Sequence, residues 1–281
     1  MINRIRALRR EGYSYSEISK KVYKSKKFVW RKSNGVQFSK KGEKRYQRLV
    51  SGIIKEIKAQ ELSLSVNKVR IIGHVLFDGC SYKNGYSHII RYINSSKRLV
   101  DQFIEDIEKV YGIFPTHLEV IKNPKVVIYK VTFSSKLLFE DLKRYFSSYS
   151  TKDVSPIPKE IMDSSKEIKL EFLRAFWEDE GSISFNGRLM ADQKNEVIIR
   201  QLIEIHKDFG LNLKLCSYKD YTGMMYKIYL SKNKDNLVRF YNLNLFDKST
   251  VTRGKNLGKD KKEVLKKIIE DSTIASRLDG H

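Results

Sequence analysis

From about residue 60 onward, apolar and polar residues follow the same plan twice along the chain. Around Asp78 the sequence reads VRIIGHVLFDGCSY, and around Glu180 it reads EFLRAFWEDEGSIS. Both are apolar, helix-like runs that end in acid–glycine before a strand-like segment. Each copy continues with a longer helical pattern that ends at a glycine, and then with a matching strand, YKVTFSSK from Tyr129 and YKIYLSKN from Tyr226. Four features in the same order at nearly equal spacing predict a duplicated α+β unit.

The boundaries of the two copies follow from the segment between them. STKDVSPIPKE holds Pro156 and Pro158, two of the four prolines in the chain, as expected for a linker. The sequence therefore predicts a first half over 61–152, a linker over 153–163, a second half over 164–268 and a C-terminal tail over 269–281.

The first helix of the second half has a recognisable start and a recognisable buried face. Ser164 and Glu167 have the spacing of a capping box, which predicts where the helix begins. Four apolar residues then share one face at helical spacing, and that face continues towards the acidic residues: Ile168, Phe172, Ala175 and Phe176.

Small residues occupy the same place in the first helix of each half. Gly73 in the first half corresponds to Ala175 in the second, and small side chains let two helices approach closely. If these helices pack side by side, their acidic ends, Asp78 and Glu180, meet at one end of the pair.

Residues 1–45 predict a separate, all-helical module. Three short amphipathic patterns follow one another, and Ser14 with Glu17 predicts a capping box on the second of them. In the third pattern, KKFVWRK, Phe28 and Val29 are expected to pack inward while the basic residues point outward. A short turn followed by a basic helix is typical of helix-turn-helix DNA-binding modules, although a basic three-helix cap without DNA contacts has the same pattern. Residues 46–60 are expected to form a basic linker.

Composition favours a nucleic-acid partner. The 281 residues include 55 Lys and Arg and carry a net charge of +22, and an excess of this size indicates a polyanionic partner. Residues 1–60 hold 18 basic and 4 acidic residues, so +14 of this charge lies in the N-terminal part. No apolar run is long enough to span a bilayer. The two cysteines and five histidines show no metal-ligand or disulfide spacing.

The three consecutive acids at the end of the second-half helix require an explanation. Glu178, Asp179 and Glu180 stand where a helix already carries partial negative charge. A solvated helix end is one interpretation, and a bound cation is the other. Two carboxylates from paired helix ends, Asp78 and Glu180, would repel each other, and a shared divalent cation such as Mg²⁺ removes that repulsion. Glu178 and Asp179 have no acidic counterpart in the first half, so we expect them to be secondary.

At these residues the sequence resembles the LAGLIDADG homing endonucleases, in the single-chain form with two motifs. IIGHVLFDG (71–79) and LRAFWEDEG (173–181) align with the nine-residue motif, and the second is the stronger match. The resemblance implies an α+β fold of two pseudo-symmetric αββαββα-like halves, here with a small all-α helix-turn-helix domain in front. It also implies that each half offers a saddle of strands to the DNA major groove.

The resemblance also implies where the site residues lie. The metal site is expected to contain Asp78, Glu180, Gly79 and Gly181, with Mg²⁺ or Mn²⁺. Polar or basic residues expected beside the acids are Asn94 or Lys136 in the first half and Gln193 or Lys232 in the second. The residues expected to bind DNA are Lys26, Lys27, Arg31 and Lys32 from the helix-turn-helix pattern, and Lys83, Arg91, Arg188 and Lys219 in the two halves.

These features predict a site-specific double-strand DNA endonuclease that acts on a long, asymmetric target. We expect a monomer without a membrane contact, located inside the cell in the cytoplasm, on the nucleoid or in an organelle. Met1 is no splicing nucleophile and SRLDGH lacks a terminal His-Asn, so an intron-encoded or free-standing enzyme is expected rather than an intein. A catalytically inactive DNA-binding regulator and an intron RNA maturase stay open as alternatives.

Overall fold

The chain divides into two compact units, Met1–Glu56 with Gly112–Phe114 and Ile57–Tyr111 with Pro115–His281. The computed structural model describes residues 1–22, 24–40, 42–43, 46–47, 63–123, 126–150, 155–184, 186–221, 223–231 and 233–278. Among these residues, no helix combines the length and the apolar character that crossing a membrane requires.

In the described part of the smaller unit, three short helices surround a small apolar core. They are α1 (Ile2–Arg10), α2 (Tyr15–Val22) and α3 (Lys26–Ser33). Ile5, Ile18 and Val29 are fully buried and form the core. The Ser14 hydroxyl accepts a hydrogen bond from the Glu17 amide (3.2 Å), and the Glu17 carboxylate accepts one from the Ser14 amide (2.8 Å). The predicted capping box is therefore confirmed, whereas the helix-turn-helix assignment stays a prediction.

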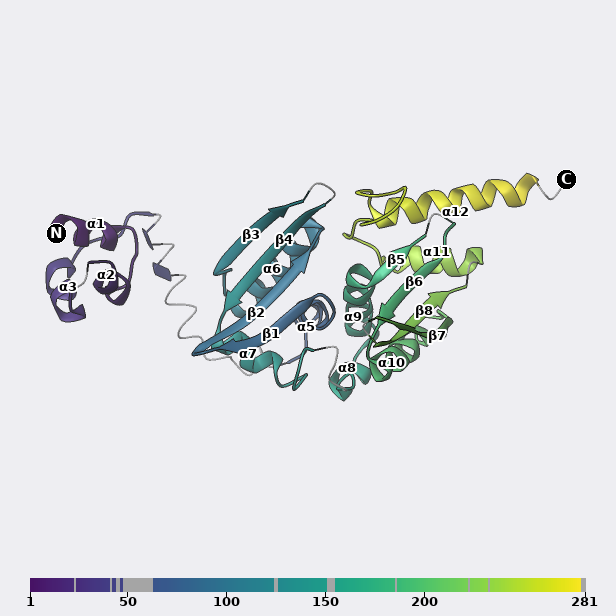
Figure 1. Cartoon of the computed structure of the whole chain (residues 1–281), viewed down its shortest axis with the longest axis horizontal. Coiled ribbons are helices and arrows are strands. Elements are labelled where there is room, and N and C mark those ends of the chain that lie inside the picture. Colours follow the sequence, from purple (N-terminus) through teal and green to yellow (C-terminus); the bar gives the residue numbers. More distant parts are fainter. Residues whose placement is uncertain are drawn as a thin grey trace. The chain divides into compact units, whose positions relative to one another are not determined.

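The larger unit contains the duplicated α+β plan that the repeat predicts (Figure 1). The first half comprises α5 (Val66–Phe77), β1 (Gly79–Asn84), β2 (Ser87–Asn94), α6 (Lys97–Tyr111), β3 (His117–Lys122), β4 (Val127–Ser134) and α7 (Lys136–Leu142). After the short α8 (Lys159–Met162), the second half comprises α9 (Lys166–Asp179), β5 (Gly181–Ile183), β6 (Leu189–Gln193), α10 (Glu196–Lys207), β7 (Leu213–Asp220), β8 (Gly223–Leu230) and α11 (Lys234–Asn242). A longer helix, α12 (Lys261–Leu278), follows.

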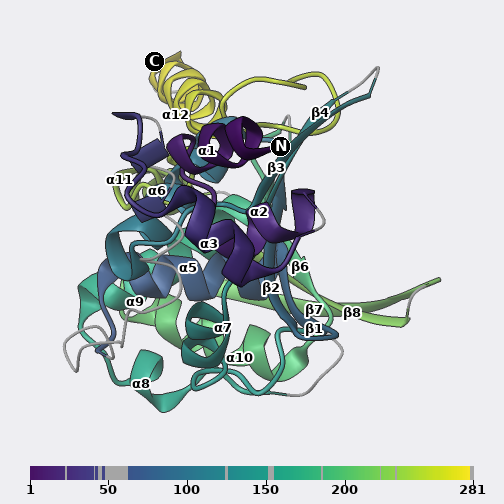
Figure 2. The same cartoon turned by 90° about the vertical axis from the view of Figure 1, so that its left-hand side faces the viewer.

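Each half has an antiparallel four-stranded sheet, and the strand orders β1-β2-β4-β3 and β5-β6-β8-β7 are equivalent. Figure 2 shows the strands of both sheets on one side of the larger unit and most of its helices on the other. Residues paired in register lie on the same face of a sheet. Buried pairs define the helix-covered face of each sheet: Ile90–Phe133, Tyr92–Val131 and Ala191–Ile228. The opposite face of each sheet is open.

The start of α9 differs from the prediction by one residue. Ser165, not Ser164, is the N-cap, and its hydroxyl accepts a hydrogen bond from the Ile168 amide at 3.4 Å. The Ser164 hydroxyl instead donates to the Ile161 carbonyl at 2.7 Å, which ties it to the end of α8. The predicted capping box of Ser164 with Glu167 is therefore wrong, because α8 already uses the hydroxyl that would have capped α9.

Helices α5 and α9 pack directly against each other between the two sheets (Figure 1). A Cβ atom added at Gly73 would lie 2.6 Å from Cβ of Ala175. The two small residues therefore set the distance between the helices, as their matching positions in the repeat predicted.

Gly73→Ala is expected to destabilise the protein by about 1–3 kcal/mol, because a Cβ at this distance forces the helices apart or distorts them. Chemical denaturation of the purified variant measures the loss. Its control is the double variant Gly73→Ala/Ala175→Gly, which moves the methyl group to the other helix and should recover part of the stability. Equal stability of Gly73→Ala and wild type would contradict this close packing.

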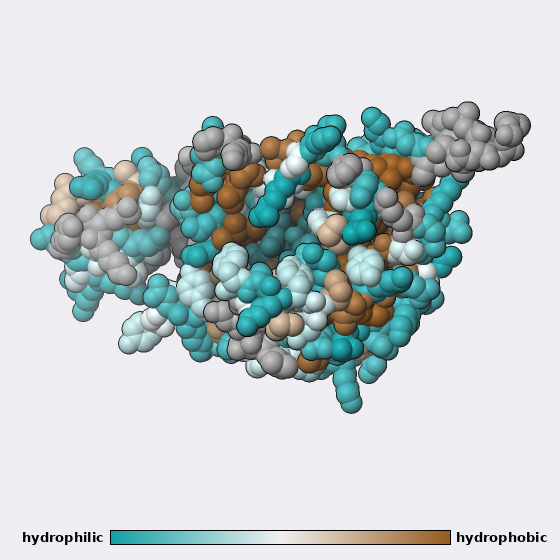
Figure 3. Space-filling view, turned by 45° about the vertical axis from the view of Figure 1, so that its right-hand side comes forward, coloured by the Kyte–Doolittle hydropathy of each residue, from teal (hydrophilic) through white to brown (hydrophobic). Residues whose placement is uncertain are grey.

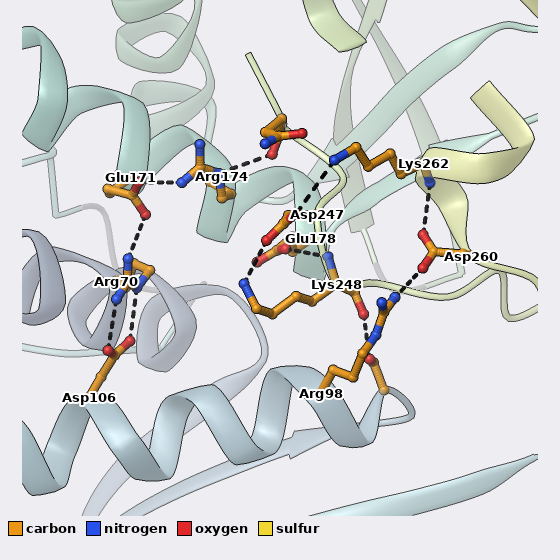
Figure 4. A network of polar contacts seen from close by, with 12 residues as sticks. Arg70, Arg98, Asp106, Glu171, Arg174, Glu178, Asp247, Lys248, Asp260 and Lys262 are labelled. Atoms are coloured by element: carbon orange, nitrogen blue, oxygen red, sulfur yellow. Dashed lines mark hydrogen bonds and ion pairs between the residues drawn. The ribbon is translucent and has the colours of Figure 1, made fainter. Parts of the chain in front are cut away.

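Ion pairs and hydrogen bonds also join the two halves (Figure 4). The Arg70 guanidinium donates to Asp106 on α6 (2.8 Å) and to Glu171 on α9 (2.9 Å), and Arg174 also pairs with Glu171. At the other end of the interface the Ser96 hydroxyl donates to the Lys248 carbonyl at 2.5 Å. These contacts fix the relative position of α5 and α9, and with it the position of their acidic ends.

His206 is a buried neutral histidine in the core of the second half. Its Nδ1 lies 2.6 Å from the Leu202 carbonyl, and its Nε2 accepts a hydrogen bond from the Trp177 indole at 2.7 Å. Protonation would place a second N–H against the indole donor. Burial lowers the pKa of His206 from 6.5 to about 4.

A lowered histidine pKa makes the folded state less stable as the solution is acidified. The unfolded state takes up a proton near pH 6.5 and the folded state only near pH 4, so stability falls between these values, by about 3 kcal/mol in total. We expect His206→Gln to have a flatter dependence of unfolding free energy on pH over this window. Parallel curves for the variant and the wild type would rule out His206 as the source.

Candidate active site

The end of α5 places Asp78 beside an amide from the adjacent strand. Asp78 is the C-cap residue of α5, and its backbone N–H donates to the His74 carbonyl at 3.2 Å. The Asn94 side-chain amide, at the end of β2, donates to the Asp78 carboxylate at 3.0 Å. The structure thus brings together two residues that the sequence assigned to one site.

The end of α9 repeats this arrangement. Glu180 is the C-cap residue of α9, and the Gln193 side-chain amide donates to its carboxylate at 3.2 Å. Asn94 pairs in register with Tyr129, and Gln193 pairs with Tyr226, so the two amides occupy equivalent positions in the two sheets. Each half therefore contributes one acid and one amide.

The acids at the paired helix ends are partly buried, and they are close enough for the charge of Asp78 to act on Glu180. Burial, with the neighbouring charge of Asp179, raises the pKa of Asp78 to about 8. Burial, followed by the charges of Asp78 and Asp179, raises the pKa of Glu180 well above its usual value. Both carboxylates thus lie in a region where a positive charge would stabilise their ionised forms.

Asp179 connects the two halves through its carboxylate. One carboxylate oxygen lies 2.8 Å from Nδ1 of His74, and both side chains are completely buried. The other oxygen accepts hydrogen bonds from the Tyr92 hydroxyl (2.6 Å) and the Asn94 amide (3.3 Å). Burial alone would lower the pKa of His74, but the charge and hydrogen bond of Asp179 raise it on balance. The Asn94 amide thus touches both Asp78 and Asp179.

Glu178 and Lys261 complete the surroundings of the acids. Glu178 accepts a hydrogen bond from the Lys248 amide at 2.9 Å, and burial raises its pKa to about 7. The Lys261 ammonium donates to the carbonyls of Gly181 (2.7 Å) and Glu178 (3.2 Å). Burial lowers its pKa to about 8, although the charges of the nearby acids act in the opposite direction.

The glycines after the two acids are required by the local geometry. A Cβ at Gly79 would lie 2.6 Å from Cα of Val75, and one at Gly181 would lie 2.3 Å from the Trp177 carbonyl oxygen. Only glycine fits where each helix turns directly into its strand. Packing therefore explains the glycines at positions 79 and 181, and their place in a metal site stays a prediction.

Asp78 and Glu180 are suitable ligands for a hard divalent cation. Mg²⁺ binds one or two carboxylates and completes its coordination with water and substrate phosphate oxygens. Within the residues that the structure describes, no group of three or more His, Cys, Asp or Glu side chains could hold a metal ion. A cation at Asp78 and Glu180 would therefore need water or phosphate oxygens as further ligands. The oxygens of Asp179 are already hydrogen-bonded, which leaves the crowded pair Asp78 and Glu180 as the candidate ligands.

The open faces of the two sheets carry basic residues next to tyrosines. In the first sheet Arg91 donates to the Tyr82 hydroxyl at 2.6 Å. In the second sheet the Lys227 ammonium lies 4.7 Å from the centre of the Tyr218 ring. Figure 3 shows that this face of the larger unit is hollowed and that hydrophilic residues line much of it.

Arg91 is a predicted DNA-binding residue on the open face, whereas the lysines of the central strands were not predicted. Lys130 and Lys227 follow Tyr129 and Tyr226 in the two matching strands, and by register they lie on the open faces. Their matching positions in the repeat were a signal that could have identified them.

The other residues predicted to bind DNA or to lie beside the acids are spread over several elements. Lys83 pairs in register with His88, and its ammonium lies 3.9 Å from Glu140 of α7, on the helix-covered side. Arg188 and Lys219 are exposed, near β6 and within β7. Lys136 is the first residue of α7. The basic groups that do most to lower the pKa of Asp78 are His74 and Lys261. Lys232 lies outside the described residues.

Helices α5 and α9 pack against each other through Gly73 and Ala175, and each ends in an acid followed by a glycine. Each helix leads into a four-stranded sheet, and the two sheets have equivalent strand orders. The chain has a two-motif LAGLIDADG fold. The predicted α+β class and the predicted duplication are confirmed by this topology.

Solved structures that are similar to this chain include LAGLIDADG proteins. A variant of the homing endonuclease I-DmoI has a TM-score of 0.48 and 16% identity, over 65% of this chain and 96% of that one. The homing endonuclease I-WcaI bound to its DNA recognition sequence has a TM-score of 0.46 and 18% identity, over 64% and 81% of the two chains. The N-terminal LAGLIDADG domain of WhiA has a TM-score of 0.43 and 15% identity, over 75% and 92%.

Relatives by sequence are distant. An uncharacterised protein of Methanocaldococcus jannaschii, MJ0398, is 24% identical over 284 residues, which cover 96% of this chain and 93% of that protein. A DNA polymerase of Thermococcus kodakarensis is 21% identical over 169 residues, which cover 58% of this chain and 9% of the polymerase. No family model matches the chain.

Proposed function

We propose that this protein is a site-specific, metal-dependent endonuclease of double-stranded DNA. The observation that carries the proposal is the convergence of Asp78 and Glu180, each with its own amide partner, at the paired ends of α5 and α9. These partly buried carboxylates come from two equivalent helix ends, and burial and neighbouring acids raise the pKa of both; such a pair is arranged for a divalent cation rather than for stability.

Asp78 and Glu180 would hold Mg²⁺ or Mn²⁺, which when bound supplies charge neutralisation and activation of water for phosphodiester hydrolysis. Asn94 and Gln193 orient the two carboxylates by donating hydrogen bonds to them. Lys261 brings a positive charge close to the same acids and to the backbone of Gly181. That charge also favours the approach of a DNA phosphate.

The open sheet faces are proposed to bind the DNA duplex on either side of this centre. A two-stranded or larger β-surface fits the major groove, where Arg and Lys side chains donate to guanine and to phosphates. Arg91 with Tyr82 and Lys227 with Tyr218 are the first candidates for base contacts. The side chains of the two sheets differ, so the proposed target is long and asymmetric and one monomer is sufficient to bind it.

The proposal is tested with a plasmid library that carries randomised inserts. The protein is incubated with the library in Mg²⁺ or Mn²⁺, and in parallel in EDTA, and the new DNA ends are sequenced. We expect cuts at one recurring sequence only when the metal is present. Absence of cutting in either metal, with intact DNA binding, would overturn the nuclease assignment.

A DNA-binding protein without nuclease activity is the second candidate. It is favoured by the buried ammonium of Lys261, which already supplies one positive charge among the acids. The same library separates the two candidates, because a binding protein would enrich one sequence on a filter without cutting it.

The smaller unit is proposed to bind DNA as a second, tethered contact. Lys26, Lys27, Arg31 and Lys32 are exposed on α3 while Val29 is buried. Two linked DNA-binding units raise the effective concentration and lengthen the contacted site.

Deletion of residues 1–45 is therefore expected to leave a folded, metal-dependent nuclease with weaker binding. Its footprint should be shorter on one side of the cut, and its affinity should fall less steeply with salt, because fewer phosphates are contacted. Alanine at Lys27 and Arg31 should reproduce part of the loss. Footprinting and a salt series provide the measurement, and an unchanged footprint with an unchanged salt slope would show that the unit does not contact the target.

A further inference from the structure

An exposed tryptophan on α3 is not explained by the packing of the smaller unit. The chain has two tryptophans. Trp177 is fully buried in the second half, whereas Trp30 is 47% exposed. The core of the smaller unit is formed by Ile5, Ile18 and Val29, and Trp30 is not part of it. A large indole left in solvent on a basic helix indicates a contact surface.

Trp30 lines a hollow together with Tyr15, Lys26 and Lys27. The Tyr15 ring is held in place, because the Arg9 guanidinium lies 4.2 Å from its centre. Trp30 stacks on no other aromatic ring within the described part of the chain. The walls are thus two aromatic rings and the methylene stems of two lysines, whose ammonium groups add positive charge.

The two lysines have no acidic partner among the described residues. Neither forms a described ion pair, and the nearest acid along the described chain, Glu17, is hydrogen-bonded to the Ser14 amide instead. Residues 1–60 carry 18 basic and 4 acidic residues, so the hollow lies in the most positive part of the sequence. Its ligand must therefore combine a flat apolar ring with negative charge.

A nucleotide has both properties, but only when its base is unstacked. In a duplex the faces of each base are covered by its neighbours, and only base edges are accessible in the grooves. In single-stranded nucleic acid the faces are free to stack on aromatic side chains, while basic residues contact the phosphates.

We propose that the hollow formed by Tyr15, Lys26, Lys27 and Trp30 binds an unstacked base of single-stranded nucleic acid. Trp30 provides the stacking surface, and Lys26 and Lys27 contact the phosphates on either side of the base. This site is separate from the acids of α5 and α9 and does not depend on nuclease activity.

Tryptophan fluorescence of the full-length protein tests the proposal, because stacked bases quench indole emission and the buried Trp177 serves as an internal reference. The probe is an oligo-dT strand in EDTA, compared with the same strand annealed to oligo-dA. We expect the single strand to quench the emission of the wild type, and the duplex to bind with much less quenching. In Trp30→Phe, where Trp177 is the remaining emitter, the quenching should disappear.

Affinities from a filter assay complete the test. Trp30→Ala should weaken binding of the single strand by about tenfold, the usual effect of losing one stacking platform. Lys32→Ala is the matched control, since it removes a charge from the same helix outside the hollow. It should lower affinity slightly and leave the quenching intact. Thermal denaturation confirms that each variant is folded, as expected for exposed positions.

Two outcomes would overturn the proposal. Equal quenching by the duplex at saturation would show that the hollow contacts a groove, and quenching retained in Trp30→Phe would place the bound base elsewhere. Both readouts are obtained in EDTA, so a protein that fails to cut DNA can still support this site, and one that cuts DNA can still lack it.

Discussion

Asp179→Ala is expected to destabilise the protein by about 3–5 kcal/mol, the usual effect of removing one member of a buried ion pair. Its carboxylate is completely buried and accepts hydrogen bonds from His74, Tyr92 and Asn94, all in the first half of the repeat. Without it, the imidazole and the phenol hydroxyl are left buried with no acceptor, and the two halves lose their central polar contact. Urea denaturation measures the change.

A surface pair provides the matched control for this prediction. Asp101 pairs with Lys97 at the exposed start of α6, and loss of such a pair changes stability by about 1 kcal/mol or less. Asp179→Asn keeps the shape of the side chain and some of its hydrogen bonds. Its unfolding free energy should therefore lie between those of wild type and Asp179→Ala. If Asp179→Ala were no more damaging than Asp101→Ala, the contact with His74 would have no part in joining the halves.

Asp78→Asn and Glu180→Gln are each expected to reduce cleavage of at least one DNA strand by on the order of a thousandfold, because each removes a candidate metal ligand. DNA binding should change little, since affinity for DNA comes mainly from phosphate and groove contacts, which are proposed here for the sheets. Strand-specific end labelling of the cut DNA measures the rates, and a filter assay measures the binding.

The amides beside the acids provide graded controls. Asn94→Ala and Gln193→Ala remove one hydrogen bond from each carboxylate but leave the carboxylate in place, so their effect should be smaller, about 10- to 100-fold. Cleavage by Asp78→Asn and Glu180→Gln at wild-type rates would show that these acids are not needed as metal ligands.

The repeat in the sequence is what made most of the fold predictable. Two equivalent apolar runs predicted two equivalent helices, and their small residues, Gly73 and Ala175, predicted the close contact that the structure contains. The amides Asn94 and Gln193 were placed beside the acids through the motif resemblance. Features that recur in both halves could be inferred because each copy supports the other.

Features without a counterpart in the other half could not be inferred. Lys261 comes from the start of α12, and its contact with Gly181 depends on how the chain returns after the second half. His74 and Asp179 stand where the two motifs depart from one another, so neither copy indicated that the two side chains pair. Asp179 was expected to be secondary for that reason. Such contacts depend on the packing of one half against the other.

The most direct test of the proposed centre is a count of bound Mn²⁺ by electron paramagnetic resonance on the protein in complex with its selected DNA. We predict that the wild-type complex binds Mn²⁺ and that the double variant Asp78→Asn/Glu180→Gln, bound to the same DNA, loses it. The same amount of bound Mn²⁺ in both complexes would contradict the assignment of these two carboxylates as the metal ligands.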